Sequence, residues 1–454
     1  MNGEVVDVGA EIDRSRFSPR QITIIALCGA LMIIDGYDSG ELAFIAPNLI
    51  RDWHLQPSML TLLFTVSGLC QIAASIFFGP LADRYGRRWL IIGCTAFTGL
   101  MSLAGAYAVG PFDFLVWRGL CALGLAPIMT NAVALGAEYA PARARSFSVI
   151  VLYCGFSIGQ IVGAAVASHL IPLYGWRIVL IIGGVIPILF ALLCVPWLPE
   201  SIRFLALTRP KSPAIAKELE RIVRDRDWTG DLLLFMSSEK PATKRPIREL
   251  FIEGRAVTTL LVWIVFLMNI TGLIFLNSWV PTLLHSAEIP IPSALRVAMM
   301  MQVGTLAGAL IMAWCMDRYR PFRVLIPAHL IGVTGLIWFG QEVGPGNVMF
   351  LAALTMGAGV LGAQIGMIGF TASLYPTSIR ATGVGWAFGI GRFGSIIGPL
   401  FGGMIISLHV PIADAFIIGA GPAVIATLSL VGLAMLHRPP DADAARAPVA
   451  EPLG

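Results

Sequence analysis

Three acidic residues stand close together in an apolar stretch near the start of the chain. Asp35 and Asp38 are three positions apart, and Glu41 follows three positions later. This spacing places the three carboxyl groups on one side of a helix. An ionisable group inside a membrane costs at least about 2.5 kcal/mol, so we expect this side to line a water-filled cavity.

Carboxyl groups crowded together away from water can bind and release a proton near neutral pH. We therefore predict that Asp35 and Asp38 are proton-coupling residues. The alternative for either is a structural ion pair with Arg118 or Arg392. Glu41 is expected either to join the substrate site or to face solvent near the outer end of its helix.

Two arginines also lie within apolar stretches. A guanidinium group stays charged and matches the geometry of a carboxylate, so a buried arginine in a cavity indicates an anionic substrate. Arg118 is predicted to bind that carboxylate. Arg392 lies in a glycine-rich stretch, where substrate contact and a structural ion pair are equally open.

Polar and aromatic residues at similar depth can bind a ring and its hydroxyl groups. Together with the two arginines, the predicted substrate-binding residues are Tyr37, Glu41, Asn269, Asn277, Gln364 and Trp386. Gln160 and Gln302 are similar amide candidates, and His329 is expected to be structural. Helix packing and interhelical hydrogen bonds are the alternative roles for these side chains.

The chain that positions these residues is strongly apolar. Of its 454 residues, 57% are hydrophobic and 13% are charged, whereas soluble domains carry about a quarter charged residues. Its apolar runs are long enough to cross a bilayer as helices. Twelve spans are predicted, at residues 22–49, 58–82, 88–109, 112–137, 147–171, 177–197, 256–284, 295–316, 323–341, 346–373, 382–408 and 411–436.

Lysine and arginine residues are distributed unevenly between the two sides of these spans. The side that holds the N-terminus carries 26 of the 31, and the opposite side carries three. Because positive residues stay inside, both termini are expected in the cytoplasm, in a multi-pass protein of a bacterial inner membrane. The net charge of +4 reflects this topology and gives no indication of nucleic-acid binding.

The sequence contains a duplication. Asp83-Arg84-Tyr85 ends the second span, and Asp317-Arg318-Tyr319 ends the eighth. Tyr139 and Tyr375 follow the fourth and tenth spans, and they are separated by almost the same stretch of chain. Both copies begin on the same side, which indicates a parallel repeat of six spans. The predicted fold class is therefore an all-α integral membrane protein with twelve transmembrane helices in two six-helix bundles.

Five segments follow from this organisation. They are a cytoplasmic N-terminal segment (1–21), an N-terminal bundle (22–197), a central cytoplasmic loop (198–255), a C-terminal bundle (256–436) and a cytoplasmic tail (437–454).

Charged residues gather where the second, fourth, eighth and tenth spans end. We predict a conformational latch that holds the bundles together in one state and releases them in another, formed by Gly79, Asp83, Arg84, Gly86, Arg87, Arg88, Glu138, Arg143, Asp317, Arg318 and Arg380. Glycines there permit close helix approach and a tight turn. The alternative is that the arginines only set the topology.

The stretch Gly79-Pro-Leu-Ala-Asp-Arg-Tyr-Gly-Arg-Arg88, with its weaker copy at 313–320, resembles the major facilitator superfamily over nearly the whole chain. Within it, the chain is similar to the aromatic acid/proton symporter family. That similarity rests on Asp35-Gly-Tyr-Asp38, Arg118, Pro199-Glu-Ser-Ile-Arg-Phe204 and the stretch 375–394.

The resemblance implies proton-driven uptake of aromatic carboxylates such as benzoate or a hydroxybenzoate. It also implies that Asp35, Asp38 and Arg118 are essential. Glu41 stands where the family pattern leads us to expect a neutral residue.

We therefore expect a monomeric symporter that takes up a small organic anion with a proton by alternating access. The alternatives are a symporter for a sugar acid or dicarboxylate, and a membrane sensor on a transporter scaffold. The sequence has no Walker-type loop, metal-ligand cluster or Ser/His/Asp signature, so no enzymatic activity, cofactor or metal is expected.

Overall fold

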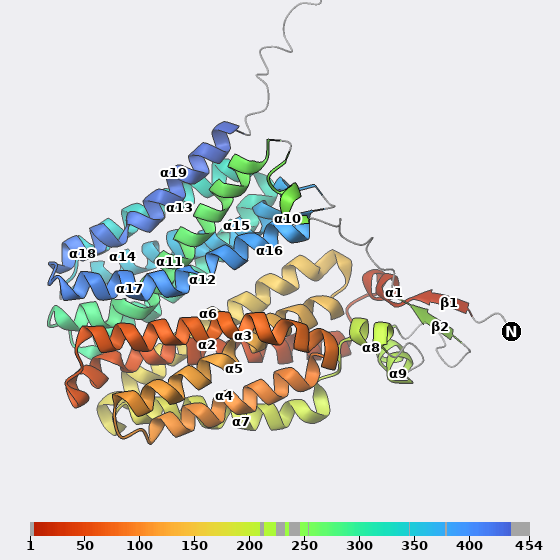
Figure 1. Ribbon diagram of the computed structural model, residues 1–454, viewed down its shortest axis with the longest axis horizontal. Coiled ribbons are helices and arrows are strands. Elements are labelled where there is room, and N and C mark those ends of the chain that lie inside the picture. The colour runs from red at the N-terminus through yellow and green to blue at the C-terminus, as the bar shows by residue number, and fades with distance from the viewer. Residues whose placement is uncertain are drawn as a thin grey trace, which may run out of the picture.

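The computed structural model describes residues 4–208, 213–223, 232–235, 246–252, 254–344, 346–376 and 379–436 (Figure 1). Twelve helical spans in the described residues are long and apolar enough to cross a membrane, which confirms the predicted fold class. The predicted tail at 437–454, part of the central loop and the side chain of Asp317 lie outside the described residues.

Six long helices form the first half of the protein. They are α2 (Pro19–Trp53), α3 (Pro57–Tyr85), α4 (Arg88–Ala106), α5 (Pro111–Tyr139), α6 (Arg145–Tyr174) and α7 (Arg177–Trp197). Proline opens three of them, where a missing N–H costs nothing. The first turn of α2 also carries a capping box, in which Ser18 and Gln21 bond to each other's backbone N–H.

The second half repeats this arrangement with more interruptions. It contains α11 (Ala256–Ser286), α12 (Ile291–Arg318), α13 (Pro321–Gln341), α14 (Val348–Met356), η2 (Gly357–Leu361), α15 (Gly362–Leu374), α16 (Arg380–Gly391), α17 (Gly394–Ser407), α18 (Ile412–Gly419) and α19 (Gly421–Leu436). The tenth predicted span is thus α14, η2 and α15, the eleventh is α16 and α17, and the twelfth is α18 and α19.

The tenth span contains a π-helical turn, η2, in its glycine-rich centre. Glycine is required there because neighbouring backbones come very close. A Cβ on Gly357 would collide with the backbone of Met301 in α12, and one on Gly359 with that of Gly332 in α13. The glycines therefore allow the tenth span to lie directly against both neighbours.

The two halves meet through equivalent helices. Across the interface α3 packs against α17, α6 against α12, and α2 against α11. These are the second span with the eleventh, the fifth with the eighth, and the first with the seventh. The pairing is what two copies of one six-span unit related by a pseudo-two-fold axis should give.

The apolar core is shared at one end of the molecule and divided at the other. One cluster joins both halves through residues such as Leu42, Phe64, Trp279 and Phe339. At the end that carries α8 (Ile202–Thr208) and α9 (Pro213–Ile222), each half has its own core. We call this end the terminal end; there the bundles separate (Figure 1).

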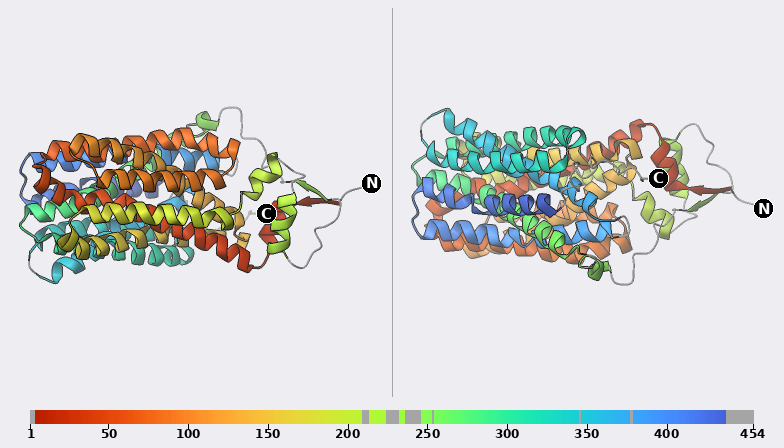
Figure 2. Two further views of the ribbon diagram at one scale, coloured as in Figure 1. Left: turned by 90° about the horizontal axis from the view of Figure 1, so that it is seen from below. Right: turned by 90° about the horizontal axis from the view of Figure 1, so that it is seen from above.

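Short elements lie at the terminal end, most of them against the first bundle, and the N-terminus is at the same end (Figure 2). They are β1 (Glu4–Asp7), α1 (Val8–Arg14), η1 (Ala142–Ala144), α8, α9, β2 (Leu232–Phe235) and α10 (Pro246–Glu249), the last at the second bundle. β1 and β2 pair in parallel, with Glu4 opposite Leu232. Arg20 and Glu218, 3.0 Å apart, join α2 to α9.

Candidate functional site

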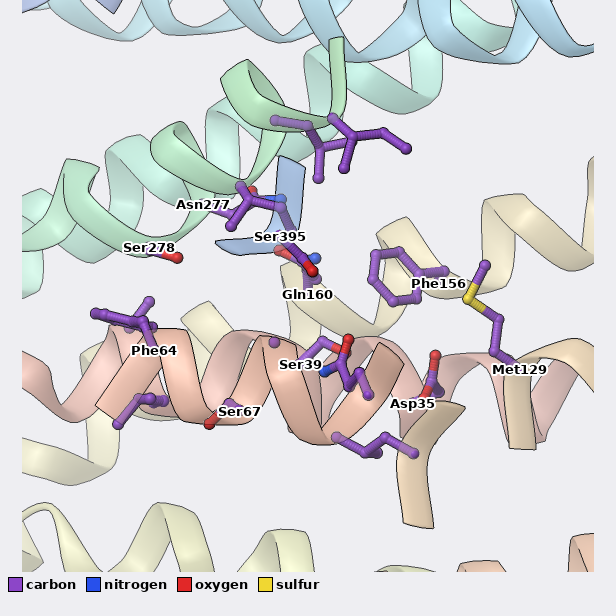
Figure 3. Close-up of a pocket in the computed structure, with 18 of the residues that line it drawn as sticks. Asp35, Ser39, Phe64, Ser67, Met129, Phe156, Gln160, Asn277, Ser278 and Ser395 are labelled. Atoms are coloured by element: carbon purple, nitrogen blue, oxygen red, sulfur yellow. The ribbon is translucent and has the colours of Figure 1, made fainter. Parts of the chain in front are cut away.

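A cavity of about 330 Å³ lies between the two bundles near the middle of the spans. Helices α2, α3, α5 and α6 form one wall, and α11, α12, α15, α16 and α17 contribute to the other. The wall is mostly apolar, with a few polar groups converging from both halves (Figure 3). Its charged and amide side chains are Asp35, Gln71, Arg118, Gln160, Asn277, Gln302 and Gln364.

Asp35 and Asp38 lie at different depths behind this wall. Asp35 lines the cavity and points into it (Figure 3). Asp38, one turn further along α2, is completely buried. Neither of its carboxylate oxygens has a hydrogen-bond partner in the described part of the chain.

Glu41 forms an ion pair with Arg118 inside the first bundle. One guanidinium nitrogen, Nη1, lies 2.9 Å from Glu41 Oε2, and Nη2 donates to the backbone oxygen of Asp38 at 2.6 Å. Ser102 Oγ is 3.3 Å from each oxygen of Glu41. Arg118 lines the cavity, whereas Glu41 is fully buried on the side of Arg118 that faces away from it. Glu41 therefore neutralises Arg118 without reaching the cavity.

Two residues that the sequence did not single out complete this charged centre. The hydroxyl of Ser102 in α4 lies within hydrogen-bonding distance of Glu41, and Gly183 in α7 leaves the space that the carboxyl groups of Asp38 and Glu41 occupy. Serine and glycine are common in apolar helices, so neither carries a signal in the sequence. Tyr37, in contrast, turns away from the cavity and donates to the backbone oxygen of Val179 at 2.9 Å.

Three amide side chains join the two bundles at the cavity. Gln302 Nε2 in α12 lies 2.8 Å from Gln160 Oε1 in α6 and 2.8 Å from Asn277 Oδ1 in α11. All three residues line the cavity. Each therefore keeps one end of its amide group available for a ligand. We call these residues the amide bridge.

The second bundle has a further polar chain that ends at the cavity. Asn269 Nδ2 donates to Gln364 Oε1 at 2.9 Å, and Asn269 Oδ1 faces His329 Nε2 at 3.2 Å. Of these three residues, Gln364 lines the cavity. Asn269 and His329 are buried behind it.

Arg392 and Trp386 stand apart from this centre. Arg392 occupies the turn between α16 and α17, is half-buried, and makes no ion pair within the described ranges. Trp386 is 38% exposed and stacks on Trp263 with 5.9 Å between ring centroids.

Several predicted latch residues come together at the terminal end of the first bundle. Arg87 Nη2 is 2.9 Å from Glu138 Oε1, and Glu200 Oε1 accepts the backbone N–H groups of Arg87, Arg88 and Ser201. Gly86 has a φ of +95°, and a Cβ there would collide with Glu200. Glu200 was not predicted, although it lies in the Pro199–Phe204 motif.

The other predicted latch residues do not join this cluster. Asp83, Arg84, Arg143, Arg318 and Arg380 are exposed. Gly79 is also exposed, and a Cβ on it would meet no atom within 4 Å. In this conformation the observed ion pair of the cluster is thus contained within the first bundle.

Two pseudo-symmetric six-helix bundles, with a cavity between them into which a few polar groups converge, define a secondary transporter of the alternating-access type. A model of the Major Facilitator Superfamily matches residues 27–368. The structure is also similar to that of the xylose transporter XylE from E. coli in a partially occluded inward open conformation. The TM-score is 0.67, with 17% identity over 92% of this chain and 100% of that one. The chain belongs to the major facilitator superfamily.

Full-length relatives are transporters of aromatic acids. The chain is 33% identical to the 4-hydroxybenzoate transporter PcaK of Pseudomonas putida over 94% of this chain and 96% of PcaK. It is also 33% identical to a gallate transporter of Pseudomonas putida, over 94% of each chain. With a benzoate transport protein of Acinetobacter baylyi the identity is 28%, over 96% of this chain and 94% of that protein.

Proposed function

We propose that the protein is a proton-coupled symporter that imports a small aromatic carboxylate, such as benzoate or a hydroxybenzoate, by alternating access. The observation that carries this proposal is Arg118, which reaches the cavity from a cluster of three carboxyl groups. A cavity of about 330 Å³ suits a single-ring acid, because ligand pockets start at roughly this size. The aromatic acids named for the relatives agree with this choice.

The charges near the cavity favour joint binding of a proton and an anion. Glu41 already neutralises Arg118, so a bound carboxylate would add an uncompensated negative charge. Protonation of one acid removes that excess. Asp38 is best placed to carry the proton, because a charged carboxylate without any hydrogen bond in a buried site is costly.

Asp35 can pass the proton between the cavity and Asp38. It lines the cavity one helical turn before Asp38, so water reaches it first. A proton and a carboxylate bound together add no net charge, so the loaded cavity has the same charge as the empty one and the bundles can rock in both states. With one ligand missing, an unpaired buried charge opposes closure.

The distribution of positive residues assigns a direction to this cycle. It places the terminal end in the cytoplasm. The bundles separate at that end, so the conformation described is the one that releases substrate inward. When the terminal end closes, the cluster around Arg87 and Glu138 would meet the second bundle and act as the predicted latch.

Uptake into proteoliposomes tests the proposal. Labelled benzoate and 4-hydroxybenzoate should accumulate under an inside-alkaline pH gradient and should not accumulate without one. The amide bridge can also bind the hydroxyl groups of other anions, such as sugar acids. A competition panel that includes sugar acids and dicarboxylates therefore distinguishes these substrates from an aromatic one. Uptake that does not depend on the pH gradient contradicts proton coupling. If only aliphatic acids compete for uptake, the proposal of an aromatic substrate is wrong.

A further inference from the structure

His329 lies near the middle of α13 and is 2% exposed. Both of its ring nitrogens face an oxygen atom. Nδ1 is 2.9 Å from the backbone oxygen of Leu325, and Nε2 is 3.2 Å from Asn269 Oδ1. Both oxygens are acceptors, so both contacts are hydrogen bonds only when the ring carries two N–H groups, that is, as the imidazolium.

The amides beyond the ring follow from this state. Asn269 uses its oxygen to accept from His329, so its Nδ2 donates to Gln364 Oε1 at 2.9 Å. The Oε1 atom of Gln364 is thereby occupied. The group that Gln364 offers to the cavity is then its amide nitrogen, which is a hydrogen-bond donor.

Loss of one proton from the ring reverses the chain. The carbonyl of Leu325 is fixed in the helix, so the remaining N–H stays on Nδ1 and Nε2 becomes an acceptor. It then faces the acceptor Asn269 Oδ1, and a flip of the Asn269 amide, which exchanges its oxygen and nitrogen, restores the hydrogen bond. Gln364 must flip in turn, and its carbonyl oxygen becomes the group offered to the cavity.

Charged residues on the surrounding helices stand far along the chain from this site. α13 packs against α12, α14, η2, α15, α18 and α19, and α11 reaches His329 through Asn269. The titratable side chains on these elements, other than cysteine, are His285, Arg296, Asp317, Arg318 and Asp414, and α13 itself carries Arg323. All of them lie at or near helix ends. Among the described side chains, none acts electrostatically on the His329 ring.

We propose that His329 is a proton-linked positioning residue, which determines through Asn269 whether Gln364 presents a donor or an acceptor to the ring substituent of the substrate. This inference rests on the proposed function, because it requires an aromatic acid in the cavity. The protonated ring favours substituents that accept hydrogen bonds. The neutral ring favours substituents that donate them, such as an amine or a hydroxyl.

Two ligands with the same carboxylate and different substituents test the inference. The affinities of para-aminobenzoate, a donor, and para-formylbenzoate, an acceptor, are measured by calorimetry on the purified full-length protein between about pH 5 and 8. Protonation of Asp35 or Asp38 affects both ligands alike, so it cancels in the ratio of their affinities. The ratio should shift toward the amine by about three- to tenfold as the pH rises, the effect of one hydrogen bond.

His329→Gln should make this ratio independent of pH, and Gln364→Leu should do the same. His169→Gln is the matched control. His169 Nδ1 also lies 2.9 Å from the backbone oxygen four residues earlier, but the residue is exposed on α6. The pH dependence of the ratio should therefore be unchanged in this variant.

The possible outcomes separate this inference from the proposed function. If neither acid binds at any pH, the proposed aromatic substrate is wrong and the inference falls with it. If both bind and the wild-type ratio stays constant, the inference is wrong and the function stands. Should His329→Gln fail to fold, ¹⁵N NMR of the histidine rings in the wild type decides, because a ring that never changes protonation in this pH range overturns the proposal.

Discussion

The two halves of this transporter differ in the chemistry of their centres. The first half places charged groups at the cavity, with Asp35, Asp38 and Glu41 around Arg118. The second half contributes neutral amides and His329. Asn269 is the counterpart of Asp35 in the second copy. The sequence spacing between Asp35 and Asn269 equals the spacing between Asp83 and Asp317.

One position of the ancestral repeat is therefore an acid in the first copy and an amide in the second. Arg118 has no charged counterpart, because residues 348–361 in the corresponding tenth span include no charged residue. The two copies kept the same helix arrangement while their polar groups diverged. We expect the first half to govern charge compensation and proton coupling, and the second half to govern recognition of the ring.

The largest effect is expected for Arg118→Gln. This change leaves Glu41 buried without its partner, and breaking a buried ion pair costs about 3–5 kcal/mol. Uptake should fall at least about a hundredfold, as measured with labelled substrate. Arg51→Gln is the control, because the side chain of Arg51 is 67% exposed.

A double variant keeps this prediction testable if Arg118→Gln alone is unstable. Glu41→Gln combined with Arg118→Gln removes both charges, so thermal stability should recover while uptake stays absent. Recovery of uptake in the double variant would contradict the assignment of Arg118 as the carboxylate-binding residue.

Asp38→Asn is expected to separate coupling from binding. The amide is similar in shape and cannot release a proton, so uptake driven by a pH gradient should fall about a hundredfold, the lower end of the range for a proton-transfer role. Exchange of internal for external substrate should persist. Asp414→Asn, at an exposed acid, should change neither rate. Equal loss of exchange and uptake would place Asp38 in substrate binding instead.

Gln302→Leu should weaken binding without altering the coupling. It removes both hydrogen bonds of the amide bridge, each worth about 0.5–1.5 kcal/mol, so the apparent affinity should fall about tenfold. Dependence on the pH gradient should stay as in the wild type, because no charge changes. A changed gradient dependence would show that the two halves do not divide their roles in this way.

The smallest effect is expected for Trp386→Leu. Trp386 was predicted to bind substrate, but its ring stacks on Trp263 and does not line the cavity. The affinity for benzoate should stay within about twofold, while stability falls by about 0.5–1.5 kcal/mol through loss of the aromatic pair. Calorimetry measures the affinity, and thermal unfolding measures the stability. A large loss of affinity would show that Trp386 does contribute to substrate binding.

The spans and the charged residues could be predicted from the sequence, because a bilayer restricts both strongly. An apolar run must match the membrane thickness, and a charge within it must find a partner or water. These constraints led to the twelve spans and to Asp35, Asp38 and Arg118 as candidates. The breaks within spans ten to twelve were not predicted, because glycine-rich apolar runs read as continuous helices.

The direction in which each acidic side chain points could not be predicted from the spacing of the residues alone. Three positions on an α-helix turn the side chain by about 300°, so each step from Asp35 to Asp38 to Glu41 moves it back by about 60°. The helix rotation therefore takes Asp35 into the cavity and Glu41 into the first bundle. Which of them faces the cavity depends on how α2 packs, and that information is spread over the neighbouring helices.

The link between His329, Asn269 and Gln364 was also beyond the sequence. The three residues belong to α13, α11 and α15, and no spacing relates them. Each has an ordinary structural role when considered alone.

The π-helical turn η2 has a consequence for how the tenth span can change in length. A π-turn holds one residue more than the α-helical turn it replaces, and Gln364 follows it directly in α15. Deleting a single residue within 357–361 would restore the α-helix and leave Gln364 on the same side of the helix, because the turn loses only its extra residue. The side chain would stay at the cavity wall, so a one-codon deletion in this turn shortens the span and leaves unchanged both the group that Gln364 offers and the residues around Arg118.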